Sequence, residues 1–226
     1  KQNMDIQTFS RSQALNNIPG KKSEMYIQNV QKSNLSFQNK NIKISAVNRW
    51  IDSNIPVDYW DISMEKDFSG SKDLLNNYNE YIKDLNSSYI NGNSILFAGN
   101  HGLGKTFTSC SILKVASLKS YKCLYTTLTD SINVLLNGSN EDKYLSRREL
   151  IMVDFLVMDE VDPRFIGSEQ ASDLYARTLE SIFRTRSQNK LPTLMCSNSP
   201  NIEESFRGTL KASIDSLMKG YLKIIP

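Results

Sequence analysis

The sequence predicts an α/β domain in which helices flank a parallel sheet on both faces. From about residue 93 onward, short apolar stretches alternate with stretches whose apolar residues recur at helical spacing. A glycine-rich turn joins the first apolar stretch to a helix, and a later apolar stretch ends in two neighbouring acids. Strands that alternate with helices are typical of a parallel sheet. The chain of 226 residues is long enough for one such domain with a modest extension.

The front of the chain differs in composition from the rest. Residues 1–45 are rich in Asn, Gln, Ser and Lys and hold seven basic but two acidic residues. They predict a loosely ordered N-terminal arm, with a short helix near Ser23–Gln31, that either binds a partner or is simply solvated. Ala46–Ser53 predicts one or two helical turns. These end at Asn54-Ile55-Pro56, because the residue before a proline is pushed out of the helical region. The predicted domain therefore spans 46–226.

The first helices and strands of the domain follow from apolar spacing and from turn residues. Asp67–Leu85 carries apolar residues at helical spacing, and Asn91-Gly92-Asn93 turns the chain into the short apolar strand Ser94–Ala98. Phe107–Leu118 again repeats apolar residues at near-helical spacing. Tyr121–Thr126 is then the second predicted strand.

Later elements are predicted in the same way. Asp130–Leu136 is a short helix that ends at Asn137-Gly138-Ser139-Asn140, and a charged helix is expected around Glu141–Glu149. The remaining expected elements are the apolar strand Phe155–Glu160, the long helix Ser168–Thr185, the strand Leu191–Ser197, the mostly helical stretch Glu203–Lys219 and the short strand Tyr221–Ile225.

The turn after Ser94–Ala98 has the pattern G-x-x-x-x-G-K-[ST] in the strand-to-helix context that a P-loop requires. Its glycines let backbone N–H groups point inward, and the new helix adds its positive N-terminal end. Lys105 is expected to reach the outer phosphates, and the Thr106 hydroxyl to hold Mg²⁺. The motif therefore predicts binding of ATP with Mg²⁺. The predicted nucleotide-binding residues are Gly99, Asn100, His101, Gly102, Leu103, Gly104, Lys105, Thr106 and Phe107.

The apolar run Phe155–Glu160 ends in an acid pair, as a Walker B strand does. The carboxyl end of a buried parallel strand lies beside the P-loop, where Asp159 could hold Mg²⁺ and Glu160 could act as general base toward water. The alternative is a buried strand followed by a charged loop. Asn198, after another apolar strand, could position the attacking water and sense the γ-phosphate, or could simply form a turn with Ser199-Pro200. Lys105, Glu160 and Asn198 are thus the predicted catalytic residues.

Other classes of protein are disfavoured by composition. The cysteines Cys110, Cys123 and Cys196 lack metal-ligand spacing, and His101 is the one histidine, so neither a disulfide framework nor a zinc site is expected. We expect buried cysteines and a cytoplasmic protein. No apolar run is long enough to span a membrane, and no secretory signal is visible. Residues 46–226 hold 20 basic and 22 acidic groups, so bulk charge does not indicate nucleic-acid binding.

The ordered set of motifs resembles the DnaC/DnaI/IstB group of AAA+ ATPases, whose members are replicative helicase loaders and transposition helper ATPases. The resemblance covers about residues 46–226. In chain order, the features that carry it are Asn54-Ile55-Pro56, the helix with Tyr78 and Tyr81, the P-loop, Asp159-Glu160, Arg186, Leu191-Pro192-Thr193 and Ser197-Asn198.

The resemblance implies an AAA+ core without a separate C-terminal lid, and a sensor role for Asn198. It implies an ATP-dependent loader that binds a hexameric, DnaB-type replicative helicase and helps place it on single-stranded DNA. Such a loader would self-associate through its core. Basic residues that could contact the strand are Lys143, Arg147, Arg148 and Arg164, and the alternative for each is a solvated surface residue.

Two features depart from the family pattern. The family usually carries two arginines, four residues apart, in its last helix, where Ser213 and Leu217 stand here. One of them is an arginine finger, worth about 10³–10⁵ in rate, so hydrolysis is expected to be slow or partner-dependent. Candidate substitutes are Arg184, Arg186, Arg207 and Lys211, although charged helix surface is the interpretation that we prefer for each. The N-terminal zinc module of some loaders has no counterpart in residues 1–45, because no cysteine precedes Cys110.

Other functions remain compatible with these motifs. A transposition helper ATPase, similar to IstB, would use the same core with duplex DNA and a transposase. A weakly hydrolysing regulator that occupies a helicase would need no arginine finger. A small-molecule kinase is less favoured, because the pair Asp159-Glu160 suits activation of water.

Overall fold

The computed structural model describes residues 20–162, 169–200, 202, 216 and 219–224. None of the helices in these ranges is long and apolar enough to cross a membrane. The helices and strands are, in chain order, α1 (Gly20–Lys32), α2 (Phe37–Asp52), the 3₁₀ helix η2 (Val57–Tyr59), α3 (Lys72–Lys83), α4 (Leu85–Asn91), β1 (Ser94–Ala98), α5 (Lys105–Leu118), β2 (Cys123–Thr127), α6 (Leu128–Asn137), α7 (Asn140–Met152), β3 (Phe155–Asp159), α8 (Glu169–Gln188), β4 (Thr193–Ser197) and β5 (Tyr221–Ile224).

In the described part of the chain, five strands form one sheet in the order β2-β3-β4-β1-β5. Every neighbouring pair is parallel, which confirms the predicted α/β class. Strand β4 comes late in the sequence but is inserted between β1 and β3. Ala98 of β1 lies opposite Ser197 of β4, and Met158 of β3 lies opposite Met195 of β4. The carboxyl ends of β1, β4 and β3 therefore meet at one edge of the sheet.

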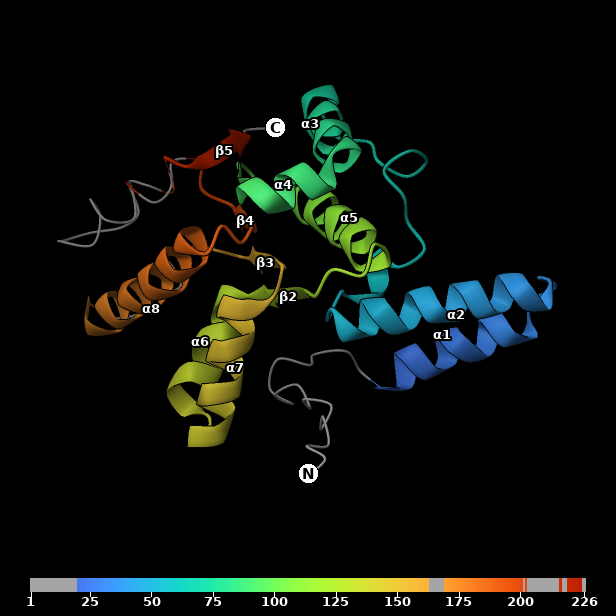
Figure 1. Cartoon of the computed structure of the whole chain (residues 1–226), viewed down its shortest axis with the longest axis horizontal. Helices are drawn as coiled ribbons and strands as arrows, with labels where there is room; N and C mark the ends of the chain where they lie inside the picture. The colour runs from blue at the N-terminus through green and yellow to red at the C-terminus, as the bar shows by residue number, and fades with distance from the viewer. Residues whose placement is uncertain (1–19, 163–168, 201, 203–215, 217–218, 225–226) are drawn as a thin grey trace, which may run out of the picture.

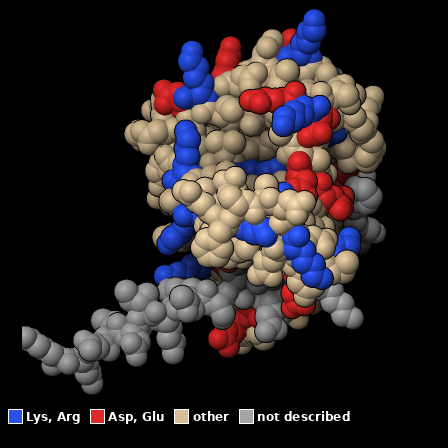
Figure 2. Space-filling model, turned by 90° about the vertical axis from the view of Figure 1, so that its right-hand side faces the viewer, with Lys and Arg blue, Asp and Glu red and all other residues tan. Residues whose placement is uncertain are grey.

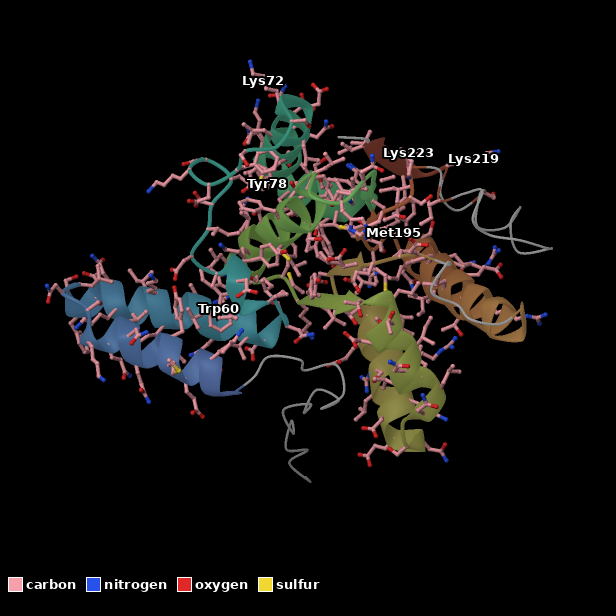
Figure 3. The ribbon with its side chains drawn as sticks, turned by 180° about the vertical axis from the view of Figure 1, so that it is seen from behind. Trp60, Lys72, Tyr78, Met195, Lys219 and Lys223 are labelled. Atoms are coloured by element: carbon pink, nitrogen blue, oxygen red, sulfur yellow. The ribbon has the colours of Figure 1, made fainter. Side chains whose placement is uncertain are left out.

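Helices cover both faces of the sheet, because alternate residues of each strand point to opposite sides. Ile95 and Phe97 of β1 belong to the core that includes buried residues of α2, α3 and α5. Leu96 and Ala98 belong to the core that includes α6, α7 and α8. Figure 1 shows these two groups of helices on opposite sides of the strands, and Figure 3 shows Met195 between them. Strands β1, β3 and β4 are buried along their whole length, as expected for central parallel strands.

The front of the described chain is a helical hairpin, whereas the sequence predicted a loosely ordered arm with one short helix. Helices α1 and α2 pack side by side (Figure 1). Ser36 starts α2 by accepting a hydrogen bond from the Asn39 N–H at 3.3 Å. Val30 is the apolar side chain that is buried among the described residues of α1. The apolar stripe of this helix is therefore weak in the sequence, even though the helix forms. The boundary predicted between residues 45 and 46 falls inside α2.

Three contacts join the hairpin to the segment after η2. The Tyr26 hydroxyl donates a hydrogen bond to the Asp61 carboxylate, which also pairs with Lys43 Nζ at 3.1 Å. The Tyr26 ring meets Trp60 edge to face, with centroids 5.2 Å apart. Trp60 is buried, and its Nε1–H donates to the Ile55 carbonyl at 2.8 Å. Figure 3 shows Trp60 beside the hairpin helices. The hairpin is thus attached to the domain by aromatic and charged groups together.

Two predicted helices need correction or lie outside the described residues. Asp67–Leu85 was predicted as one helix, but α3 begins only at Lys72, because Ser71 is its N-cap. Asp84 then ends α3 and caps α4. The predicted helix Glu203–Lys219 lies almost entirely outside the described residues.

The three cysteines are buried free thiols, as predicted. Burial raises the pKa of the Cys110 and Cys196 thiols well above the ordinary value, and the charge of Asp159 adds to this. Both thiols therefore stay protonated and fill space in the core.

Candidate functional site

The glycine-rich turn and the acid pair are both attached to the carboxyl end of β4. After β1, the Gly99 N–H donates to the Ser197 carbonyl at 3.2 Å. After β3, the Val161 N–H donates to the Cys196 carbonyl at 2.9 Å. Because β4 lies between β1 and β3, the two segments leave the sheet on either side of one strand. Neighbouring strands lie about 4.8 Å apart. The sequence predicted this convergence, and the strand order explains it.

The glycine-rich turn has the backbone that its sequence requires. Gly102 and Gly104 have φ values of +80° and +85°, in the region that favours glycine. Lys105 begins α5 and is 5% exposed. Its Nζ donates to the Gly99 carbonyl at 2.9 Å and to the Asn100 carbonyl at 2.7 Å. The ammonium group therefore lies inside the turn, beside the start of a helix.

Electrostatics also place Lys105 near the acid pair. Burial lowers the pKa of the Lys105 ammonium, and the negative charge of Asp159 opposes that shift. A basic group and a carboxylate thus lie close enough to interact, as a phosphate with its metal ion would require.

Asp159 is held by two hydrogen bonds. It is 5% exposed; its Oδ2 accepts from the Tyr125 hydroxyl at 2.8 Å, and its Oδ1 accepts from the Glu160 N–H at 2.8 Å. Burial and the charge of Asp159 raise the pKa of Tyr125, so the phenol remains a donor. Tyr125 lies on β2 and was missed from the sequence, because its contact with Asp159 spans two strands.

Glu160 follows the strand and is exposed, with φ +53°. Burial of part of the side chain raises the pKa of its carboxyl group, and the charges of Asp159 and Asp130 raise it further. His101 of the glycine-rich turn acts in the opposite direction. Glu160 is therefore within electrostatic reach of Asp159, of Asp130 on α6 and of His101 in the turn, and it is open to solvent. A carboxylate with a raised pKa is well suited to accept a proton from water.

Asn198 is the first residue after β4 and is half-buried. Its strand lies between the strands that carry the glycine-rich turn and Asp159, which is where a group that senses a terminal phosphate would have to be. The role of Asn198 stays a prediction. Among the other predicted nucleotide-binding residues, the half-buried ones are Leu103, Gly104, Thr106 and Phe107, and the exposed ones are Asn100, His101 and Gly102.

The donors present fit Mg²⁺ bound together with phosphates. In the described residues, no group of three or more His, Cys, Asp or Glu side chains could hold a metal ion by itself. Thr106 and Asp159 offer one hydroxyl and one carboxylate from the two segments that flank β4. Mg²⁺ commonly takes one or two protein oxygens and completes its shell with phosphate and water. These two residues are therefore the ones that would hold it.

The structure excludes Arg186 as an arginine finger. Its side chain is 0% exposed and donates to the carbonyls of Leu150, Val153 and Pro192 and to the Thr193 hydroxyl, at 2.7–3.0 Å. Burial lowers its pKa to about 10. Arg186 therefore joins α8 to the starts of β3 and β4 from inside the core. No signal in the sequence separates such an arginine from a surface one.

The remaining basic candidates are only partly described. Arg184 is exposed and pairs with Glu180 on the same helix at 2.6 Å. On α7, Lys143 is half-buried, whereas Arg147 and Arg148 are exposed. Arg164, Arg207, Lys211, Ser213 and Leu217 lie outside the described residues.

Solved structures with a similar fold belong to DNA-replication proteins. AMPPCP-bound DnaA from Aquifex aeolicus matches with a TM-score of 0.59 and 18% identity, over 76% of this chain and 50% of that chain. The DnaC helicase loader matches at 0.58 and 16%, over 75% of this chain and 98% of that chain. DnaI matches at 0.56 and 16%, over 73% and 88%.

The alignments span about half the length of the two AMPPCP-bound DnaA chains but most of DnaC and DnaI. No protein-family model and no curated protein matches the sequence. At these identities the likeness shows the fold. It is the fold of the DnaC and DnaI structures, as the motifs predicted.

Proposed function

We propose that this chain is an ATP-dependent loader that binds a hexameric replicative helicase and helps place it on single-stranded DNA. The observation that carries the proposal is the arrangement around β4: the glycine-rich turn on one side, Asp159 and Glu160 on the other, and Asn198 at its end. The fold shared with the DnaC helicase loader and DnaI supports the choice of partner.

The chemistry proposed for the site is hydrolysis of ATP. Lys105 exchanges its two carbonyl acceptors for β- and γ-phosphate oxygens, while the main-chain amides of 99–106 surround the phosphates. Bound Mg²⁺, held by Thr106 and Asp159, supplies positive charge to the phosphates. Glu160 takes a proton from a water whose oxygen attacks the γ-phosphorus; the bond to the bridging oxygen breaks, and ADP and phosphate leave. Asn198 orients that water.

The charges around Glu160 predict the pH dependence of turnover. Activity should fall on the acid side as Glu160 becomes protonated, at a pH above the ordinary glutamate pKa of about 4.3. Asp130→Asn removes a negative charge that favours the protonated form, so the pKa of Glu160 should drop and the acid limb should move to lower pH. The measurement is kcat against pH for both proteins. Glu141→Gln, a change on the exposed surface of α7, should leave the limb in place. An acid limb that stays fixed or moves upward in Asp130→Asn would contradict the assignment.

The α1–α2 hairpin is the surface that we assign to the helicase. Its residues 20–52 contain six Lys and Arg but two acids, Glu24 and Asp52. Figure 2, which faces the hairpin's free end, shows uncharged surface bordered by basic side chains and, on its right, also by acidic ones. Large apolar side chains exposed on the hairpin are Met25 (62%), Leu35 (42%), Phe37 (81%) and Ile42 (62%). Exposed apolar groups among positive charges fit a partner with an apolar, acidic surface.

The contact with single-stranded DNA is assigned to α7. Tyr144 is 63% exposed, and Arg147 and Arg148 follow at three and four residues, on the same face of the helix. Aromatic rings that stack on bases, next to cations that contact phosphates, are the usual elements of single-strand binding.

Capture of the helicase tests the proposal. A hexameric replicative helicase from the same genome should be retained by the unaltered chain in the presence of ATP. Phe37→Glu should weaken retention at least about tenfold, because central apolar anchors carry most of an interface's energy. Leu118→Glu, a comparable change on the exposed end of α5, should have no effect. The assignment of the hairpin would be overturned if Phe37→Glu retained the helicase as well as the unaltered chain does, or if Phe37→Glu and Leu118→Glu lost it equally.

A weakly hydrolysing helicase regulator is the second candidate, and Arg186 favours it. One possible arginine finger is buried in the core, and Arg184 is paired within its own helix. Turnover measured with helicase and single-stranded DNA separates the two functions. The loader requires stimulated hydrolysis, whereas the regulator binds ATP with turnover at background.

A further inference from the structure

An aromatic side chain from outside the P-loop motif lies directly on the P-loop. Phe68 belongs to the segment 61–71, which connects η2 to α3. A Cβ atom at Gly104 would come within 2.6 Å of Phe68 Cε2, so only glycine leaves room for the ring there. The ring also contacts Phe107, with centroids 5.6 Å apart and planes inclined by 52°. Phe68 is half-buried, so one part of it packs on the P-loop and another faces solvent.

A second glycine makes room for the same ring. A Cβ atom at Gly70 would overlap the outer edge of Phe68, although the backbone of Gly70 is not in the left-handed region. Two glycines are thus adapted to the ring: Gly70 in its own segment and Gly104 in the P-loop. The position of Phe68 is therefore built into the structure from both sides.

The segment that carries Phe68 is anchored at its start. Lys114 of α5 donates from its Nζ to the carbonyls of Tyr59, Trp60 and Ile62, at 2.7, 2.9 and 2.7 Å. Since α5 is the helix that begins in the P-loop, these hydrogen bonds connect the start of the segment to the P-loop itself. A compact turn precedes Phe68, closed by hydrogen bonds between Ser63 and Asp67.

Phe68 is one of three aromatic rings beside the phosphate cradle. Phe107 follows Thr106 in the first turn of α5, and Tyr59 meets Phe107 edge to face at 6.4 Å. All three rings are half-buried. The P-loop therefore combines main-chain amides and an ammonium group with neighbouring aromatic rings that are partly exposed. Charged phosphates and a planar heteroaromatic base are the two groups that match this combination.

We propose that Phe68 contacts the base of the bound nucleotide, and that the segment 61–71 encloses the base end of the site. This inference rests on the proposed binding of ATP and adds the residue that recognises the base. Since every base has an aromatic face, a stacked phenylalanine strengthens nucleotide binding without selecting strongly among bases. The phosphate end is independent of Phe68.

The test compares ATP with inorganic tripolyphosphate, which carries the phosphates without a base. In Phe68→Ala, ATP affinity should fall about 5- to 150-fold, the range found when stacked aromatic residues are replaced by alanine. Tripolyphosphate affinity should change by less than about twofold, a difference too small to reflect a lost contact. Ile90→Ala, which removes an exposed apolar side chain from α4, is the matched control and should change neither. Thermal unfolding of each variant checks that the fold is intact.

Gly70→Ala provides a second test, in which Phe68 is kept but its ring is displaced. ATP affinity should fall in the unaltered background and should not fall further in Phe68→Ala, because both changes act through one contact.

Three outcomes would overturn the inference while leaving the proposed function intact. If Phe68→Ala weakens ATP and tripolyphosphate equally, the ring supports the P-loop rather than the base. If it tightens ATP binding, the ring obstructs the site. If Gly70→Ala lowers ATP affinity as much in Phe68→Ala as in the unaltered chain, its effect does not depend on Phe68. If the unaltered chain binds neither compound, the proposed function itself fails, and the inference fails with it.

Discussion

Lys105→Ala should abolish ATP binding at ordinary nucleotide concentrations. The Lys105 ammonium is buried inside the glycine-rich turn and holds the carbonyls of Gly99 and Asn100 in the absence of phosphate. Truncating one partner of a buried charge pair costs about 2–5 kcal/mol, or roughly a 30- to 4,000-fold rise in the Kd for ATP. Equilibrium titration with ATP and Mg²⁺ measures this directly.

The control for this change is Lys119→Ala, which removes an exposed lysine at the other end of α5. It alters net charge equally and should leave the Kd unchanged. Because Lys105→Ala also frees two carbonyl groups, its unfolding temperature must be compared with that of the unaltered chain. A folded Lys105→Ala protein that binds ATP normally would refute the phosphate site.

Glu160→Gln should stop turnover and spare binding. The substitution keeps the shape of the side chain but removes its ability to accept a proton from water. General-base catalysis contributes about 10²–10⁴-fold, so kcat should fall by that factor while the Kd for ATP changes by less than about threefold. Single-turnover hydrolysis, with the Kd measured in parallel, separates the two quantities.

Two control variants show whether the loss of turnover is specific to Glu160 or follows from the loss of any acidic residue. Glu141→Gln removes a negative charge from the exposed surface of α7 and should retain full activity. Asp159→Asn should differ from both, because Asp159 would hold Mg²⁺ and its loss should weaken the response of ATP binding to Mg²⁺. Undiminished hydrolysis by Glu160→Gln would remove the general-base role.

Much of the central domain was predictable because its chemistry is local in sequence. Ser94–Ala98 was placed as a strand with the bounds that β1 has, since polar residues flank five buried ones. The acid pair was placed at the end of β3 by the same reasoning. The strand order could not be read from neighbouring residues in the sequence. It puts β4 between β1 and β3, and therefore brings Asn198 next to the ends of both strands.

The hairpin was not predictable in the same way. α1 buries little apolar surface and gains its stability from contacts with α2 and with Asp61 and Trp60, which are distant in sequence. The pattern of residues 23–31 did indicate a short helix, but no clear apolar stripe indicated that α2 begins at Phe37 or that the two helices pair.

The structural roles of three further residues were missed for a related reason. No sequence motif marks the roles of Tyr125, Phe68 and Arg186. Each residue acquires its role from a partner on another element of the fold. Arg186 is the clearest case, since the sequence offered it as a surface arginine while the fold surrounds it with carbonyl groups.

The most direct measurement is a crystal structure of the chain with AMPPCP and Mg²⁺. The phosphates should lie against the main-chain amides of 99–106, with Mg²⁺ between Thr106 and Asp159 and a water within reach of Glu160. Density for the nucleotide at any other place, or phosphates bound there with Asp159 still turned only toward Tyr125, would contradict the account.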